Sequence, residues 1–273
     1  MASDDDHHHE EADFADLLNL DAEVLRDYLT ALTGWIAELT DGAAPSRILD
    51  LGSGTGTGAL ALAGRFPGAH VTAVDQSGEL LGHLRDKAHD LDLADRIDTV
   101  EADLDTGWPG FGPVDLVWAS ASLHHLADPG RVLTEVFGAL RPGGLLVAVE
   151  LDSFPRFLPG DLAGVEARVH QVSDAIRAEH LPLFGSDWGP VLGKAGFIVE
   201  ASRVFTIDLS APLPAATGRY AKATLQRLRG AVQGRLNSTD LAALDALLAG
   251  DALLRRDDLE VHTTRTVWVA RRP

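Results

Sequence analysis

Along the middle of the chain, segments with a strand-like pattern of hydrophobic residues alternate with segments that have a helical pattern. Short apolar runs predict strands at 47–51, 70–75, 97–102, 114–119 and 145–150, and apolar positions three and four residues apart predict helices at 57–66, 78–90 and 129–140. Strands that alternate with helices indicate a parallel sheet covered on both faces. Because such crossovers are right-handed, the strand order reverses once and opens a crevice at the carboxyl ends of the strands, where we expect the functional site.

After Glu150 this alternation stops. A proline-rich segment encloses an amphipathic helix from about Asp161 to His180, and later strands at 197–209 and 261–271 flank helical stretches at 215–231 and 238–249. The pattern predicts a Rossmann-like domain over 46–273 with insertions at about 151–190 and 210–260.

The first sixteen residues hold seven acidic side chains and no Lys or Arg, which predicts a disordered acidic tail over 1–16. From Leu17, apolar positions recur at helical spacing, and Asp21 is suitably placed as an N-cap. We therefore expect a helical N-terminal lid over 17–45.

Composition narrows the classes of function. The chain has 273 residues, 45% of them hydrophobic, and a net charge of -18, which argues against nucleic acid or an anionic membrane as partner. No cysteine is present, so disulfides, thiolate metal sites and a Cys nucleophile are excluded, and a cytoplasmic location is permitted. The apolar runs are shorter than the ~20 residues of a membrane helix. We expect no metal site and no membrane span.

Glycine stands at positions 52, 54, 56 and 58, between a predicted strand and a predicted helix. Alternate glycines let the backbone approach a ligand closely and bring its amides to the amino end of the helix. No Lys follows them, which excludes the phosphate-binding loop of nucleotide triphosphatases. For Gly58 we favour close packing of the helix over contact with a ligand.

The next strand ends at Asp75, where a carboxylate could accept hydrogen bonds from both hydroxyls of a ribose. Gly54, Gly56 and Ala59 also satisfy the dinucleotide pattern G-x-G-x-x-G/A. At this point a nicotinamide-dependent oxidoreductase remains an alternative.

Four ordered motifs carry a resemblance to a known family. They are Leu49–Gly56, Val74–Ser77, Val100–Leu104, and Val114–Pro129 with the later Leu140–Leu146. Together they resemble the class I S-adenosylmethionine-dependent methyltransferases of the small-molecule type, strongly over residues 46–150. The resemblance implies an α/β fold with a doubly wound, mostly parallel seven-stranded sheet whose last strand is antiparallel.

The same resemblance implies S-adenosyl-L-methionine as cofactor. Asp50 and the loop residues Gly52, Ser53, Gly54 and Gly56 would face its methionine part, whereas Asp75 would hold the ribose, with Gln76 beside the adenine. Asp103 would accept the adenine amino group, Leu104 would pack on the ring, and Ala119 would line the same pocket. Asp103 could instead cap the following turn.

His124 and His125 follow the fourth strand, at the edge where the methyl group would lie. Imidazole titrates near neutral pH, which suits a general base, and we prefer His124. The pair could equally orient the helix that begins near Asp128. The loop also resembles that of phosphoethanolamine methyltransferases, which pair a His with a lid Tyr, and Tyr28 is the matching candidate here.

Other candidates have weaker support. Glu150 and Asp152 could steer a polar substrate or be solvated. On the inserted helix, Arg168 and His180 flank the apolar stripe and could touch substrate, whereas His170 points away from it. We expect core packing for most of the aromatic residues of the insertions, although some could form an apolar lid: Phe154, Phe157, Phe184, Trp188 and Tyr220.

The sequence thus favours a methyltransferase that modifies an oxygen or nitrogen of a small organic molecule, acting in the cytoplasm as a monomer or homodimer. Methylation of a peptide carboxylate, a nicotinamide-dependent oxidoreductase and a non-catalytic cofactor-binding regulator remain the alternatives.

Overall fold

The computed structural model describes the backbone of residues 2–40 and 42–273, and the side chains of 11–40, 42–160 and 162–273. One seven-stranded sheet runs through it in the order β3-β2-β1-β4-β5-β7-β6. Its strands are β1 (Arg47–Leu51), β2 (His70–Asp75), β3 (Ile97–Glu101), β4 (Val114–Ser120), β5 (Leu140–Leu151), β6 (Ile198–Leu209) and β7 (Val261–Arg271). Only β7 pairs antiparallel with both of its neighbours, as predicted.

Six of the described helices lie where the periodicity predicts them, at 57–65, 78–90, 129–139, 163–180, 217–231 and 238–248, whereas the helix at 189–194 was not predicted. The described helices are α1 (Ala2–Val24), α2 (Arg26–Glu38), α3 (Thr57–Arg65), α4 (Gly78–Asp90), α5 (Pro129–Ala139), α6 (Ala163–His180), α7 (Gly189–Lys194), α8 (Thr217–Ala231) and α9 (Ser238–Leu248). Short 3₁₀ turns are η1 (Ala94–Arg96), η2 (Leu123–His125), η3 (Gly160–Leu162) and η4 (Leu253–Arg255). The strand order reverses between β1 and β4, which places the predicted crevice at their carboxyl ends.

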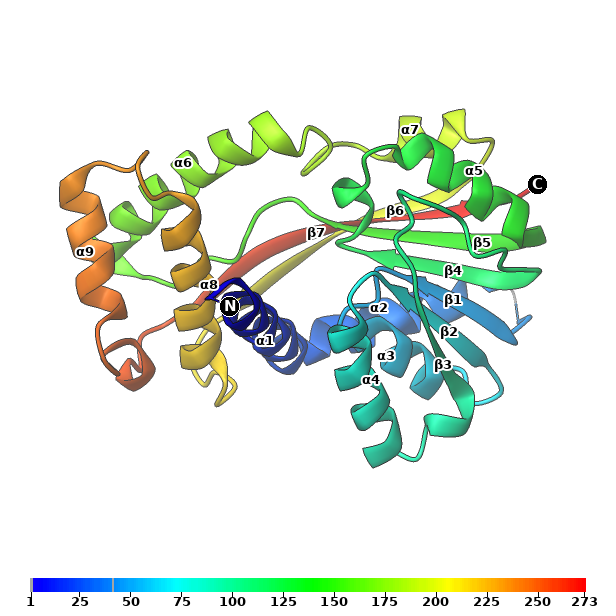
Figure 1. Cartoon of the computed structure of the whole chain (residues 1–273), viewed down its shortest axis with the longest axis horizontal. Helices are drawn as coiled ribbons and strands as arrows, with labels where there is room; N and C mark the ends of the chain where they lie inside the picture. Colours follow the sequence, from blue (N-terminus) through cyan, green and yellow to red (C-terminus); the bar gives the residue numbers. More distant parts are fainter. Residues whose placement is uncertain (1, 41) are drawn as a thin grey trace.

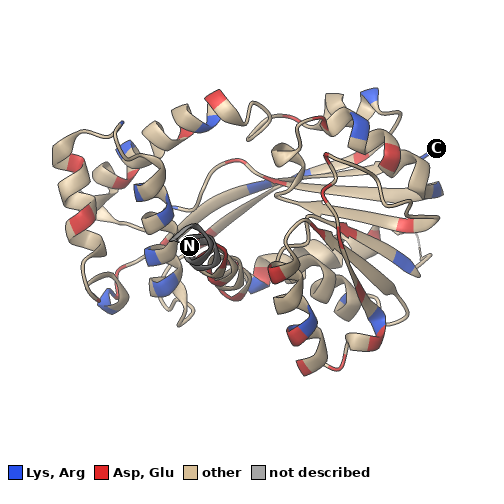
Figure 2. Cartoon of the chain, viewed as in Figure 1, with Lys and Arg blue, Asp and Glu red and all other residues tan. Residues whose placement is uncertain are grey.

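Helices and strands form two parts, as Figure 1 shows. In the first, helices cover both faces of the sheet. In the second, α6, α8 and α9 pack together beyond the end of the sheet, and the long strands β6 and β7 reach toward them. α1 lies between the two parts and contacts α8 as well as α3 and α4. Acidic and basic residues are interspersed over both parts (Figure 2).

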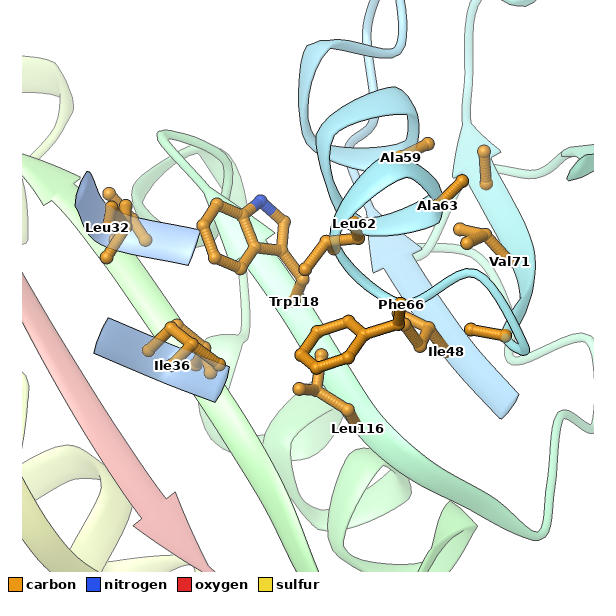
Figure 3. Close-up of a cluster of buried hydrophobic side chains, with 14 of the residues drawn as sticks. Leu32, Ile36, Ile48, Ala59, Leu62, Ala63, Phe66, Val71, Leu116 and Trp118 are labelled. Atoms are coloured by element: carbon orange, nitrogen blue, oxygen red, sulfur yellow. The ribbon is translucent and has the colours of Figure 1, made fainter. Parts of the chain in front are cut away.

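The core of the first part is built on both faces of the sheet. On one face, Trp118 of β4 is buried beside Leu32 and Ile36 of α2 and Leu62 of α3 (Figure 3). On the other face, α5 and α7 cover the strands, with Trp188 fully buried. This packing fixes the strand ends that carry the candidate site.

The N-terminal region differs from its prediction. The predicted disordered tail is wrong for residues 11–16, because they belong to α1 and Ala15 is buried; the side chains of 2–10 lie outside the described ones. Asp21 is not an N-cap, since it lies inside α1 and the helix break falls at Leu25. Contacts with α3, α4 and α8 supply burial that the local acidic composition does not reveal.

The inserted helix α6 also turns a different face to the interior. Glu166, Val169, His170 and Ser173 are its buried residues, so the prediction that His170 points away is wrong. The exposed Arg168 makes a bidentate pair with Asp240 of α9, at 2.7 Å for both bonds. α6 therefore packs against two other helices, and a single apolar stripe does not describe its buried surface.

Candidate active site

The glycine loop joins β1 to α3 through three residues with positive φ. Gly52, Gly54 and Gly56 have φ of 66°, 54° and 83°, a region that side chains disfavour. A Cβ on Gly52 would lie 2.4 Å from the Cβ of Ser122, and one on Gly56 would lie 2.1 Å from Leu84 Cδ1. The loop is therefore closely held between β4 and α4, and these positions require glycine.

Asp75 ends β2 beside this loop. Its Oδ2 accepts a hydrogen bond from the Gly54 amide at 2.8 Å, and its Oδ1 accepts one from the Ser77 amide at 3.0 Å. A carboxylate offers about four lone-pair positions, so acceptor capacity remains for the two hydroxyls of a ribose.

Two buried hydroxyls in the loop support a fit to a polar cofactor. Ser53 Oγ and Thr55 Oγ1 have no hydrogen-bond partner among the described residues. Buried polar groups without partners are uncommon and costly. Together with the acceptor capacity of Asp75, they suit the amino-acid and ribose groups of S-adenosylmethionine.

Asp50 lies beneath the first turn of α3 and is buried. Burial raises its pKa to about 7, although the Ala59 amide favours the ionised form. A Cβ on Gly58 would lie 2.7 Å from Trp118 Nε1 and 2.8 Å from Asp50 Oδ2. Gly58 is therefore a close-packing position, as favoured from the sequence.

The residues predicted around the adenine lie on neighbouring segments with different exposure. Gln76 is exposed at the end of β2, and Ala119 of β4 is fully buried. Asp103 is exposed and its Oδ1 accepts from the Asp105 amide at 2.9 Å, which is the turn-capping arrangement left open above. Leu104 is half-buried against the core of this side of the sheet.

His124 forms a buried pair with Glu150. Its Nδ1 lies 2.5 Å from Glu150 Oε2, and Glu150 Oε1 accepts from the Leu123 amide at 3.1 Å. The two side chains are 4% and 2% exposed. They come from the turn after β4 and from the end of β5, two parallel neighbours in the sheet. The carboxylate holds the imidazole in one orientation and supports an N–H on Nδ1.

His125 stacks beside this pair but lies at the surface. Its ring centroid is 4.1 Å from that of His124. Partial desolvation and the charges of His124 and Arg227 lower the pKa of His125 to about 4. His125 is therefore neutral at pH 7.

A small cluster of two aromatic residues and an arginine contacts His124 through Phe184. The Phe184 ring meets the His124 ring edge-on at 5.1 Å, and Phe154 lies 5.9 Å from Phe184. The Arg177 guanidinium lies 4.3 Å from the centre of the Phe154 ring and 4.7 Å from that of Phe184. Three predicted aromatic residues are instead fully buried core: Phe157, Trp188 and Tyr220.

Tyr28 belongs to a different cluster. Its ring contacts Phe205 at 5.3 Å, and the Arg265 guanidinium lies 5.3 Å from it. Burial raises the pKa of Tyr28 to about 12. Arg265 in turn pairs with Asp21 at 2.5 Å. The described contacts thus tie Tyr28 to β6 and β7 and do not include one with His124.

Helix α1 covers the glycine loop. The Cβ of a residue at Gly54 would lie 2.9 Å from Leu18 Cδ1. Ser77 Oγ donates to Glu11 at 3.2 Å, and Lys87 of α4 donates to Asn19 of α1. Leu18 and Asn19, from the predicted lid, thus lie against the loop and α4, and Glu11, from the predicted tail, contacts Ser77.

Asp152 and His180 complete the predicted candidates. Asp152 accepts from the Thr266 hydroxyl at 2.9 Å, and His180 ends α6 with an exposed side chain. Sequence reasoning missed the pairing of Glu150 with His124 and the position of Arg177. The first could have been found, since both residues follow adjacent parallel strands; the second depends on how α6 packs.

The reversed strand order, the glycine loop and Asp75 define a class I S-adenosylmethionine-dependent methyltransferase domain, and the chain contains one. Residues 48–144 match the family described as Methyltransferase domain. The match spans the strands and loops that build the candidate site.

Individual relatives agree with this class. The chain is 35% identical over 174 residues to a malonyl-(acyl-carrier protein) O-methyltransferase of Laribacter hongkongensis, covering 61% of this chain and 56% of that protein. It is 30% identical over 172 residues to a trans-aconitate 2-methyltransferase of Azoarcus sp., covering 56% and 65%. The matches thus span between half and two thirds of these relatives.

A solved structure shares the fold. A provisionally assigned methyltransferase from Bacillus halodurans superposes with a TM-score of 0.57 at 18% identity, covering 88% of this chain and 98% of that one.

Among the described residues, the helices are too short or too polar to cross a membrane.

Proposed function

We propose that the protein transfers the methyl group of S-adenosylmethionine to an oxygen or nitrogen of a small organic molecule. One arrangement carries this proposal: the cofactor loop with Asp75 and the buried His124–Glu150 pair follow strands that end at the same sheet edge. When bound, the sulfonium supplies a methyl group already attached to a good leaving group. The chain must then align the acceptor and exclude water.

His124 is our candidate general base. Because Nδ1 faces Glu150, Nε2 is the nitrogen left to take a proton from the acceptor. Glu150 stabilises the imidazolium that forms, and Phe184 shields the ring from solvent on one side. A base of this kind contributes about 10²–10⁴-fold to the rate.

The neighbouring residues have other proposed roles. His125 is neutral but exposed, so we assign it to the mouth of the site and not to proton transfer. Tyr28 has its hydroxyl beside Arg265 and a raised pKa, so we do not propose it as a partner of His124 in catalysis. Asp50 supports the loop from below, whereas Gln76, Asp103, Leu104 and Ala119 remain proposed neighbours of the adenine.

The test measures cofactor binding and turnover separately. Calorimetry with S-adenosylhomocysteine and, for comparison, with NAD measures which of the two compounds the protein binds. Formation of S-adenosylhomocysteine with a panel of hydroxylated, amino and carboxylic acceptors reports transfer. We expect binding of S-adenosylhomocysteine but not NAD, and turnover with at least one acceptor. Binding without turnover over the whole panel would favour a non-catalytic regulator.

A small-molecule acceptor is supported by the name of the Azoarcus relative, which acts on trans-aconitate. A cytoplasmic location, a monomeric or homodimeric state and the absence of nucleic acid as partner belong to the same proposal. Cell fractionation and light scattering test the first two.

A further inference from the structure

Arg177 lies one aromatic ring away from His124. α6 runs from the helical part back toward the sheet (Figure 1). Arg177, near its carboxyl end, lies over the rings of Phe154 and Phe184. Phe184 contacts both the guanidinium and the His124 imidazole, at 4.7 Å and 5.1 Å between the respective centres. A cation thus stands at a fixed place beside the proposed base.

The guanidinium has donors to spare. Its side chain is 11% exposed, and its two hydrogen-bond partners, Ser173 Oγ at 2.8 Å and Asp174, both belong to its own helix. Nε is buried and has no partner among the described residues. Since a guanidinium carries five N–H groups, three remain for a ligand.

The neighbouring anions do not use these donors. Glu150 accepts from His124 and from the Leu123 amide, and Asp174, 51% exposed, neutralises Arg177 from the solvent side. The Arg177 side chain is largely withdrawn from solvent, and this desolvation lowers its pKa. A planar carboxylate matches the fork of a guanidinium and would satisfy it.

We propose that the acceptor carries a carboxylate that binds Arg177 and that a separate oxygen or nitrogen of the same molecule faces His124. The inference rests on the proposed function and adds the chemical class of its substrate. Arg177 and His124 each contact Phe184, and the described contacts include none between the two, so we assign the carboxylate as a handle and not as the methylated group. An apolar or aromatic spacer between handle and nucleophile would pack against Phe184 and Phe154.

The experiment compares each acid with its amide. 4-Hydroxybenzoate and 3-hydroxybenzoate are assayed against 4-hydroxybenzamide and 3-hydroxybenzamide, and 3-hydroxyphenyl phosphate is added as a second anion. For the wild type we expect kcat/KM at least tenfold higher for an acid than for its amide. Arg177→Gln should raise KM for the acid tenfold or more and leave the amide nearly unchanged, because only the acid loses charge-assisted hydrogen bonds. Arg177→Lys should retain part of the preference.

Arg235→Gln is the matched control, since Arg235 also pairs with an acid of α6, Glu179, but is exposed. Its kinetics should not change. Affinity for S-adenosylhomocysteine and the melting temperature check that each variant folds. Equal turnover of acid and amide, or preference for the phosphate, would overturn the carboxylate handle while methyl transfer stands. No turnover in either series or with any acceptor of the wider panel, with S-adenosylhomocysteine bound, would overturn both proposals.

Discussion

Glu150 accepts a hydrogen bond from His124 Nδ1 at 2.5 Å, across two parallel strands and away from solvent. The pairing of a buried carboxylate with an imidazole fixes the tautomer that leaves Nε2 as the acceptor of a proton. A change that weakens this hydrogen bond should therefore lower kcat.

Glu150→Gln should lower kcat at least tenfold, because an amide does not stabilise the imidazolium. Affinity for S-adenosylhomocysteine, measured by calorimetry, should stay within about twofold of the wild type, since Glu150 lies outside the cofactor loop. Glu135 of α5 is exposed, so the control variant Glu135→Gln should change neither kcat nor the affinity for S-adenosylhomocysteine. If kcat and cofactor affinity fell together in Glu150→Gln, the pair would be structural.

Asp75→Ala should weaken binding of S-adenosylhomocysteine more than tenfold, because it removes the acceptor proposed for two ribose hydroxyls. It also frees the amides of Gly54 and Ser77, so its melting temperature is measured alongside. Asp86→Ala, at an exposed position of α4, is the control. If Asp75→Ala left the affinity unchanged, the proposed contact between the Asp75 carboxylate and the ribose would be wrong.

Asp21→Asn should destabilise the fold by about 3 kcal/mol, because it leaves the buried Arg265 guanidinium without its counter-charge. Asp21 also accepts from Tyr220, so the change disturbs the contact of α1 with α8 and β7. Denaturant unfolding gives the free energy of unfolding, with Asp27→Asn on the exposed side of α2 as the control. A difference below about 0.5 kcal/mol, the scale of ordinary surface changes, would contradict the role of this pair.

His170 should make stability depend on pH. Burial, with the nearby charges of Arg156 and Arg177, lowers its pKa from 6.5 to about 4 in the folded protein. The unfolded chain therefore binds more protons between these values, and the free energy of unfolding falls as pH drops from 6.5 to about 4, by roughly 3 kcal/mol at most from this group.

His170→Phe should flatten that part of the pH profile, measured by denaturant unfolding at several pH values. His89→Phe is the control, since His89 is exposed. The same slope in His170→Phe and the wild type would mean that other groups carry the acid sensitivity.

Much of the fold could be predicted because local pattern and tertiary role agree. β2 and α4 begin and end where the periodicity places them, since a fully covered parallel sheet demands continuous apolar strands. The glycine loop is visible because positive φ and close contact with Ser122 and Leu84 leave little choice of residue.

The sequence did not predict the features that depend on contacts between distant segments of the chain. α1 is acidic and weakly amphipathic, and it is held by contacts with α8, far away in sequence. α6 buries Glu166, which accepts hydrogen bonds from the backbone amides of Phe157 and Leu158, and it buries His170 on the same face; an apolar stripe in the sequence reveals neither. The position of Arg177 depends on this packing, and so could not be placed from spacing alone.

The lid over the glycine loop has a practical consequence for handling the protein. Leu18 and Glu11 of α1 lie against the loop and Ser77, so a purification tag fused ahead of α1 would extend the helix that covers the proposed cofactor site. The carboxyl terminus lies at the opposite side of the molecule (Figure 1), and an affinity handle belongs there.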